Sequence, residues 1–595
     1  MRCSSWWILA WFVLLLAAIP RGTRPSVQQQ LHALFQEAWE YRLQTDPLFA
    51  TTVGDHRYDD RLPDVSPQAF IQRRARLTEF LRRLEAIPRD ALDREDQISY
   101  DIFRRLLQDE IREIDFRTYL MPVTDRSGFH IDFARIADYM PLHTPADYRR
   151  YIARLEKFRE FTRQHIELMR IGIREGYTVP RVVLQGIEAT LQSFIVDNPE
   201  DSVYFRPFRE FPAHFSAQEQ ETLRRLGRRV IQHVIVPAYR DLLNFMREEY
   251  IPRARQTVGA AALPNGRAFY AFRVRHFTTL DVTPEEVHRI GQQEVRRIRA
   301  EMEAVMRQVG FHGTFHEFLE FLRTDARFYV DTPEQLLKEA SYIAKRMDGM
   351  LPRLFRTLPR MPYGIEKVPD YIAPRTTTAY YEPPAGDGTK AGIYYVNTYN
   401  LRARPLYELE ALTLHEAVPG HHLQIALQME LRHLPPFRRF LGFGAFIEGW
   451  ALYAERLGLE VGFYTDPYRN FGRLTYEMWR ACRLVVDTGI HAFGWSRERA
   501  MQFMADHTAL TRHNIETEVD RYISWPGQAL GYKMGELKIR ELRQLAERTL
   551  GDDFDIREFH DVVLSHGAVP LDVLEENVRI WLSKRRSTRS DHPEP

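Results

Sequence analysis

Three histidines and a glutamate are grouped in the segment His415-Glu416-Ala417-Val418-Pro419-Gly420-His421-His422. A histidine followed directly by a glutamate begins the HExxH motif of zinc proteases, in which two histidines four residues apart bind Zn²⁺ and the glutamate activates the metal-bound water. The position four residues after His415 is Pro419, which offers no ligand atom. The chemistry of the segment therefore depends on whether His421 or His422 supplies the second ligand.

Neither histidine meets this requirement on a straight helix. Residues six apart differ by roughly 120° in direction and lie about 9 Å apart along the axis, and residues seven apart lie about 10 Å apart. Proline removes a backbone donor and glycine adopts unusual dihedral angles, so a helix distorts readily at Pro419-Gly420. We therefore expect a local bulge that brings His421 to His415, with His422 as the alternative ligand.

A third ligand is expected from the apolar segment Phe446 to Glu455. Glu448 lies there, and a carboxylate in such surroundings is costly unless it is paired or metal-bound. Glu455 lies two turns further on the same face and is the alternative ligand, or a partner of a metal-binding histidine. Glu416 would then deprotonate the metal-bound water and pass the proton to the leaving amine. Two histidines and a glutamate suit one zinc ion, with manganese and cobalt as alternatives.

Helices must position these residues, because apolar residues recur at helical spacing and helix-start signals are frequent. Three N-terminal capping sequences are Thr144-Pro145-Ala146-Asp147, Thr283-Pro284-Glu285-Glu286 and Thr332-Pro333-Glu334-Gln335. Further helices are predicted within residues 27–48, 66–115, 216–250, 404–430, 445–460, 471–512 and 533–548. Strands are predicted only at 269–277 and 393–400, so the expected fold is mainly α with a small β-sheet.

Composition and charge limit the kinds of molecule that the protein is expected to bind. Lys and Arg total 82 against 81 Asp and Glu, so no net charge favours nucleic acid or a membrane surface. A short, positively charged N-terminal segment precedes the apolar run at residues 6–19. This run is shorter than a typical transmembrane helix, but its length suits the apolar region of a signal peptide. We expect export to the periplasm or another extracytoplasmic location. In the alternative, the N-terminal segment is not cleaved and anchors the protein. A membrane tether is expected only through this segment.

Loops rich in proline and glycine suggest how the chain is divided. The predicted units are a leader at 1–25, a helical lobe at 26–270, a catalytic lobe at 271–586 and a disordered tail at 587–595. In the alternative, the two lobes form one continuous domain. Only Cys3 and Cys482 occur, so removal of the leader would leave a single thiol and no intramolecular disulfide.

Four segments together resemble the hallmark of a bacterial family known as domain of unknown function 885. These segments span residues 415–424, 448–455, 483–491 and 526–535. The resemblance covers nearly the whole chain after the leader. It implies a helical fold similar to the carboxypeptidase Taq and oligopeptidase group of gluzincin zinc metallopeptidases, with a deep cleft and a small sheet beside the active site. In those relatives the second histidine follows HExx directly, and this chain departs from them by the inserted Pro-Gly pair.

The resemblance also implies roles for residues further along the chain. Tyr532 lies in a segment similar to one that supplies tyrosine donors to the tetrahedral oxyanion, with a packed tyrosine as the alternative. His491 would be a second donor, or would pair structurally with Asp487. Arg480 and Arg483 would clamp a substrate carboxylate, with a structural ion pair as the alternative for each.

The strand at 393–400 would form an edge of the cleft and pair with an extended peptide. Substrate contacts are expected from this strand and from the tyrosine-containing segment, at Tyr394, Tyr395, Asn397 and Lys533. The leading hypothesis is an exported zinc metallopeptidase that hydrolyses short peptides. The alternatives are a metal-dependent hydrolase of other amides or esters and a non-catalytic helical binding protein.

Overall fold

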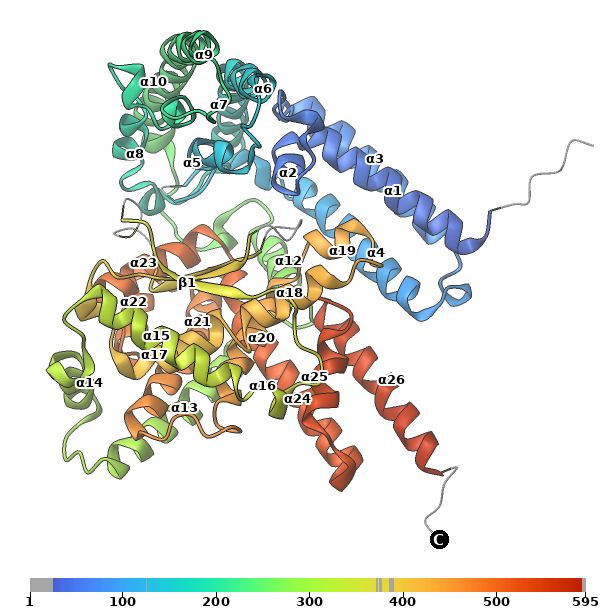
Figure 1. Ribbon diagram of the computed structural model, residues 1–595, viewed down its shortest axis with the longest axis vertical. Coiled ribbons are helices and arrows are strands. Elements are labelled where there is room, and N and C mark those ends of the chain that lie inside the picture. Colours follow the sequence, from blue (N-terminus) through green and yellow to red (C-terminus); the bar gives the residue numbers. More distant parts are fainter. Residues whose placement is uncertain (1–24, 125, 371–372, 374–376, 385–389, 591–595) are drawn as a thin grey trace, which may run out of the picture.

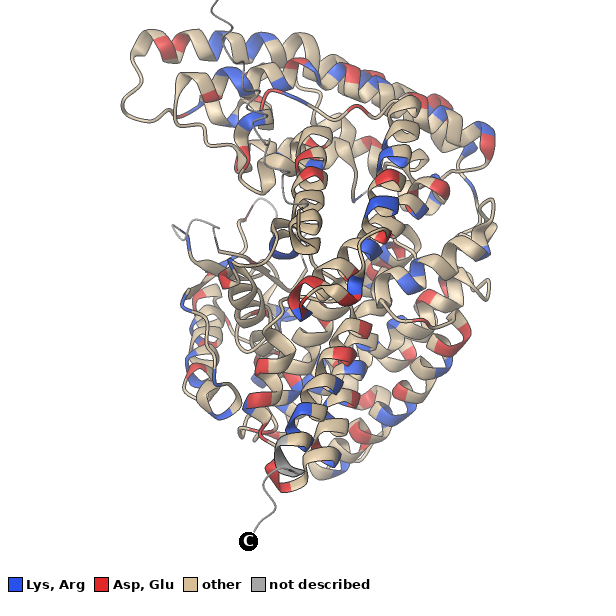
Figure 2. Ribbon diagram, turned by 90° about the vertical axis from the view of Figure 1, so that its right-hand side faces the viewer, with Lys and Arg blue, Asp and Glu red and all other residues tan. Residues whose placement is uncertain are grey.

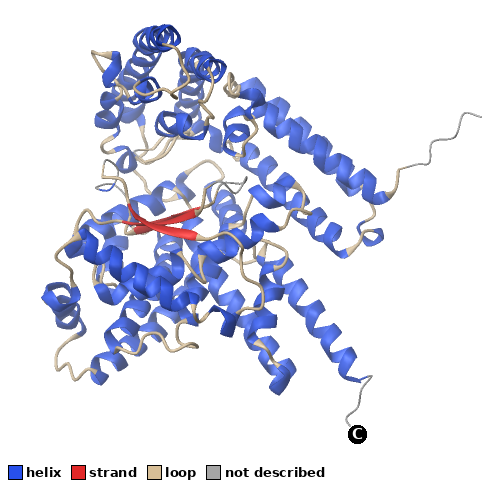
Figure 3. Cartoon of the chain, in the orientation of Figure 1, coloured by secondary structure: helices blue, strands red, loops and turns tan. Residues whose placement is uncertain are grey.

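The computed structural model describes residues 25–124, 126–370, 373, 377–384 and 390–590. Helices form nearly all of the regular structure in this part of the chain (Figure 3), which confirms the mainly α fold. The predicted leader lies outside the described residues, apart from its last position. The tail was expected to be disordered from residue 587, but the last helix continues to Ser590.

Up to residue 253, the chain forms the helices in the upper part of Figure 1 and those that cross its right side, and α12 follows near the centre of the view. Their bounds are α1 (Val27–Thr45), α2 (Pro47–Thr52), α3 (Pro67–Glu85), α4 (Arg94–Asp115), α5 (Phe129–Asp132), α6 (Pro145–Glu156), α7 (Phe158–Glu175), α8 (Ile187–Ser193), α9 (Ala217–Val230), α10 (Val236–Phe245), α11 (Ile251–Arg253) and α12 (Gly266–Thr278). The strand predicted at 269–277 is wrong, because this segment is α12. Its aromatic residues favour strands locally, but here they are buried in a helix that packs on α20 and α24.

The second half of the chain forms the lower body of the molecule (Figure 1). Its helices are α13 (Pro284–Gln308), α14 (Phe315–Thr324), α15 (Pro333–Asp348), α16 (Leu351–Leu354), α17 (Leu406–Glu416), α18 (His421–Glu430), α19 (Pro436–Phe440), α20 (Gly444–Leu457), α21 (Pro467–His491), α22 (Arg497–His507), α23 (Arg512–Ser524), α24 (Gly531–Leu550), α25 (Ile556–Leu564) and α26 (Leu571–Ser590). The three predicted capping sequences are confirmed, since Thr144, Thr283 and Thr332 each close a capping box. The predicted ranges 66–115, 404–430 and 471–512 each contain two helices.

A three-stranded sheet lies against α15 and α17, as Figure 1 shows. Its strands are β1 (Tyr363–Lys367), β2 (Ala379–Glu382) and β3 (Gly392–Val396), in the order β1-β3-β2. β3 runs parallel to β1 and antiparallel to β2. The expected cleft-edge role of 393–400 is therefore wrong, because β3 is the central strand and both of its sides already pair with neighbours.

Two large hydrophobic cores stabilise the described part of the chain. One contains buried residues from Val65 to Met534, and the other contains buried residues from Leu31 to Leu582. Each core contains residues from both sides of residue 270. Basic and acidic residues are interspersed along the helices (Figure 2). None of the described helices combines the length and apolar character needed to cross a lipid bilayer.

Small residues allow α20 and α24 to pack unusually closely. A Cβ atom on Gly449 would lie 2.5 Å from Cα of Gly535, and one on Gly535 would lie 1.9 Å from the carbonyl oxygen of Ala445. Only glycine permits backbones to approach this closely. The contact places the first turn of α24, which carries Tyr532, beside the part of α20 that carries Glu448.

Candidate metal centre

The two histidine-bearing helices are separated by a sharp turn. α17 ends at Glu416 and α18 begins at His421. Between them, Ala417 and Gly420 have ψ angles of −112° and −127°, outside the helical range, and the Val418–Pro419 peptide is cis. The prediction of a bulge within one continuous helix is therefore wrong, although the chain is distorted at the expected place. The helix stops and a second helix starts, because proline cannot donate a hydrogen bond to continue the first.

Two contacts hold this turn in place. Gly420 lies against the end of α17, where a Cβ atom would come within 1.9 Å of the carbonyl oxygen of His415. Trp450 of α20 is completely buried, and its Nε1 donates a hydrogen bond of 2.8 Å to the carbonyl oxygen of Pro419. The position of α18 relative to α17 therefore depends on a glycine in the turn and on a tryptophan from α20.

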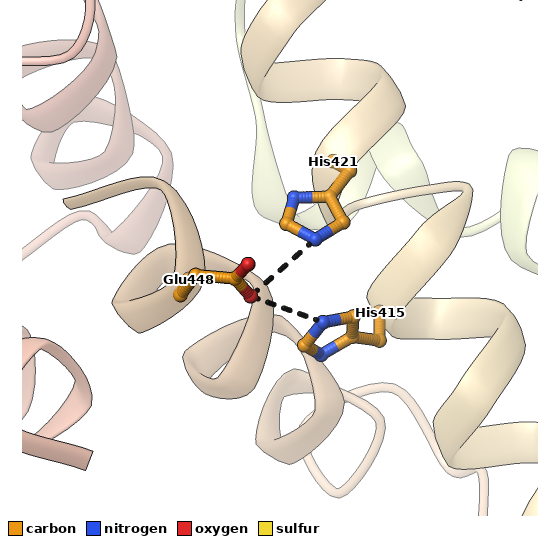
Figure 4. A group of neighbouring side chains, drawn as sticks. All are labelled: His415, His421 and Glu448. Carbon is orange, nitrogen blue, oxygen red and sulfur yellow. Dashed lines mark ion pairs between the residues drawn. The ribbon is translucent and has the colours of Figure 1, made fainter. Parts of the chain in front are cut away.

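The turn brings His415 and His421 to the same carboxylate, as Figure 4 shows. Nε2 of each histidine lies 3.6 Å from Oε2 of Glu448, and the two rings are nearly perpendicular. Ligand atoms of the three residues all lie within 4.8 Å of one another. In a tetrahedral zinc site with Zn–N of about 2.0–2.1 Å, neighbouring ligand atoms are about 3.3–3.4 Å apart. The donor types suit a zinc ion, and the two 3.6 Å distances lie close to this spacing.

Glu455 orients His415 from the opposite side of the ring. Nδ1 of His415 donates to Oε1 of Glu455 over 2.8 Å, which leaves Nε2 directed at Glu448. A carboxylate in this position fixes the tautomer and the ring orientation of a metal-binding histidine. Glu455 therefore contacts the ring nitrogen of His415 that faces away from Glu448, and it is not part of the group of three potential ligands. Nδ1 of His421 is buried and has no hydrogen-bond partner among the described residues.

His422 faces away from this group and is held by the sheet region. The Tyr381 hydroxyl lies 2.8 Å from its Nδ1, and its Nε2 donates to the carbonyl oxygen of Met361 over 3.0 Å. Both ring nitrogens are engaged, so neither can serve as a metal ligand without breaking a hydrogen bond. His422 attaches α18 to β2 and to the segment before β1.

Charged groups of both signs meet around the three ligand atoms. The carboxylates of Glu416, Glu448 and Glu455 converge here, and Arg480 contributes a permanent positive charge 3.8 Å from Glu455. Burial raises the pKa of Glu448, but the hydrogen bond of His415 and the charges of both histidines lower it to about 2. Burial raises the pKa of Glu416 to about 7. Burial lowers the pKa of His415, but the carboxylates of Glu448 and Glu455 raise it to about 9, so this histidine must release a proton before it can bind a metal ion.

Tyr532 lies on the other side of Glu448. Its hydroxyl contributes, through a hydrogen bond, to the low pKa of the Glu448 carboxyl. The same hydroxyl lies 3.3 Å from Nη2 of Arg521, and the guanidinium of Arg483 lies 4.2 Å from the centroid of the tyrosine ring. Sequence reasoning missed Arg521, because it is one of many arginines on amphipathic helices and only the fold brings α23 to Tyr532.

The two arginines expected to clamp a substrate differ in their surroundings. Arg483 is buried and donates to Glu518 and to the hydroxyl of Tyr522, so the ion pair given as the alternative is present. Its Nη1 has no hydrogen-bond partner among the described residues, and its contact with a substrate stays a prediction. Arg480 lies next to Glu455, and its Nε is buried without a hydrogen-bond partner in the described part of the chain. Its contact with a substrate stays a prediction.

His491 does not reach the metal centre as an oxyanion donor. It is completely buried, its Nδ1 accepts from the backbone N–H of Ala260 over 3.0 Å, and its Nε2 donates to the carbonyl oxygen of Tyr522 over 2.9 Å. The expected pair with Asp487 is also absent among the described contacts, since this carboxylate accepts from the N–H of Gly527 instead. Both side chains fix the packing of α21 against its neighbours.

Lys533 is a structural residue and not the expected substrate contact. Its ammonium group is fully buried and lies 2.8 Å from Glu477, 2.8 Å from Glu536 and 3.1 Å from Glu294. The three carboxylates oppose the effect of burial and raise the pKa of Lys533. This network joins α24 to α21 and α13.

The substrate contacts expected near β3 are largely structural as well. Asn397 is buried and donates to the carbonyl oxygens of Ala373 and Thr377, which corrects its expected role. Tyr394 is also completely buried in the second core. Tyr395 is partly exposed and stacks on Tyr380, so its contact with a substrate stays a prediction.

The close approach of Gly420 to α17 can be tested by adding one methyl group. Gly420→Ala should lower the free energy of unfolding by about 1–3 kcal/mol, because the methyl group must displace backbone atoms. Gly444→Ala is the matched control, since a Cβ atom there meets nothing within 4 Å and the position is helical. Denaturant unfolding of both variants measures the difference. An equal, small effect at the two positions would show that the turn is not as tight as described.

A family model and solved structures match the chain. No curated protein matches the chain. The crystal structure of a candidate lipoprotein from Colwellia psychrerythraea is 32% identical, covers 94% of this chain and 100% of its own, and superimposes with a TM-score of 0.89. A candidate lipoprotein of unknown function from Shewanella oneidensis shares the fold at 19% identity, with 93% and 99% covered and a TM-score of 0.73. The family described as "Bacterial protein of unknown function (DUF885)" matches residues 47–578, and the chain therefore belongs to it.

Proposed function

We propose that this protein is an exported zinc metallopeptidase that hydrolyses short peptides. The observation that carries the proposal is the grouping of His415, His421 and Glu448, with two imidazole nitrogens 3.6 Å from one carboxylate oxygen. Glu416 follows the first of these ligands directly, as the water-activating glutamate does in zinc proteases. The motif resemblance to gluzincin peptidases favours peptides over other amides and esters.

Each residue of the site has a role in this proposal. His415, His421 and Glu448 would hold the zinc ion, which when bound supplies a Lewis acid for the scissile carbonyl group. Glu416 takes a proton from the attacking water and delivers it to the leaving nitrogen as the C–N bond breaks. Tyr532 donates a hydrogen bond to the oxygen that gains negative charge in the transition state. Arg521, next to the tyrosine hydroxyl, keeps it in position.

An extracytoplasmic location is part of the proposal. The relative from Colwellia psychrerythraea is described as a candidate lipoprotein, which supports export of this chain as well. The apolar run at 6–19 would direct export, and any membrane tether would lie in this N-terminal segment. Cys3 precedes the apolar run, so lipid attachment at this cysteine forms no part of the proposal.

Adjacent histidines provide a matched test of metal binding. His421→Gln should weaken zinc binding by more than about 100-fold, because it removes a proposed ligand. His422→Gln should change the affinity by less than about threefold, because this side chain bonds to Tyr381 and Met361. Zinc affinity is measured by competition with a chromogenic chelator. The ligand assignment is wrong if His422→Gln is the variant that loses zinc.

The role of Glu416 can be separated from metal binding. Glu416→Gln should retain one zinc ion per chain but lose about 10²–10⁴-fold in kcat/KM on a peptide library, because an amide cannot accept the proton. Glu408→Gln, two turns earlier on α17, is the control and should keep wild-type turnover. Metal analysis and peptide assays are made on the same preparations. Wild-type turnover of Glu416→Gln would rule out the proposed proton transfer.

A further inference from the structure

A mainly apolar cavity of about 320 Å³ lies among α1, α3 and α4, with α19 at one end. Aromatic side chains dominate its wall, including Phe35, Trp39, Tyr41, Phe70, Phe80 and Phe103. None of the ligand, proton-transfer or tyrosine residues of the metal centre lines it. The volume lies within the range of small-molecule sites, about 300–1,000 Å³, and such sites are typically apolar with a few polar groups.

The wall of this cavity is firmly packed. The ring of Phe35 makes edge contacts with Phe103 and Phe437, at centroid distances of 5.1 Å and 5.0 Å. Phe70 stacks on Tyr119 at 3.9 Å. Protein interiors with interlocked rings normally leave few voids larger than a water molecule. The space is therefore a formed feature of the fold, since the rings that line it pack against one another.

Among the charged groups that line the cavity, one cation has no ion-pair partner in the described part of the chain. Arg42 pairs with Glu110 over 2.7 Å, Glu113 pairs with Arg273, and the carboxylate of Asp46 caps α2. Arg73 is different, because it has no ion-pair partner among the described residues. Its guanidinium lies 5.3 Å from the ring centroid of Phe70, which is part of the wall.

We propose that this cavity binds an apolar carboxylate, with a ring or a short alkyl chain inside and the carboxylate against Arg73. An arginine beside an apolar space attracts a carboxylate more strongly than it would in open water. A cationic ligand would not pair with this arginine, and a neutral ligand would not use its charge. The same chemistry is presented by a free aryl or aliphatic acid and by the apolar C-terminal residue of a peptide.

The cavity is separate from the metal centre but connected to the same helices. Its lining residues Phe437 and Leu441 precede α20, which carries Glu448. Glu113 at the cavity pairs with Arg273, whose Nε donates to the carbonyl oxygen of Pro526, shortly before α24. Binding in the cavity does not require the proposed hydrolytic function, so the two proposals can fail independently.

The binding test uses 4-phenylbutyrate, which contains no bond for a peptidase to cleave, and calorimetry on the full protein. The neutral 4-phenylbutanol should bind at least about tenfold more weakly, because it lacks the charge that meets Arg73. Arg73→Gln should weaken binding of the acid by a similar factor. Arg74→Gln is the matched control and should leave binding unchanged, because this exposed neighbour already pairs with Asp115.

A second variant tests the cavity itself. Ala38→Leu adds bulk to the lining and should reduce the affinity for 4-phenylbutyrate at least tenfold, with circular dichroism confirming the fold. A dipeptide that ends in phenylalanine distinguishes a free acid from the C-terminus of a peptide as the ligand. Its binding is measured on the Glu416→Gln variant, so that the dipeptide is not hydrolysed. Tighter binding of the dipeptide supports a peptide terminus, and tighter binding of the free acid supports a small acid. The proposal is overturned if neither probe binds, or if binding is unchanged in both Arg73→Gln and Ala38→Leu.

Discussion

The arrangement of the proposed metal centre depends on one helix, α20, which holds three separate parts of the site. Glu448 faces the two histidine nitrogens, Trp450 bonds the turn between α17 and α18, and Glu455 fixes the ring of His415. These residues lie within about two turns of one helix, so a shift of α20 would disturb the carboxylate, the turn and the histidine orientation together. The proposed chemistry requires all three to be correct at once.

Close packing of α20 against α24 extends this dependence to the opposite side of the site. The glycines at 449 and 535 allow the two backbones to approach, and Tyr532 is thereby brought to Glu448. The buried network around Lys533 then ties α24 to α21 and α13. Of the residues that the sequence predicted to be catalytic or substrate-binding, only a few lie near the Glu448 carboxylate. The larger number hold the helices against one another.

Much of the fold was predictable because its signals are local. Capping boxes and apolar spacing identified most helices, and the straight-helix geometry required a distortion between His415 and His421. That geometry does not say whether a helix bulges or breaks, since the outcome depends on the contact between Gly420 and α17 and on Trp450. The partners of His422 are likewise supplied by residues 41 and 61 positions earlier. Such long-range contacts leave no pattern near the residue itself.

The central claim is that one metal ion binds among His415, His421 and Glu448. Anomalous diffraction at the zinc absorption edge, from crystals grown with equimolar zinc, tests it most directly. The account predicts one strong peak within about 2.0–2.2 Å of both Nε2 atoms and of a Glu448 oxygen. A principal peak at His422 or elsewhere, or no peak in crystals of the zinc-treated protein, would contradict it.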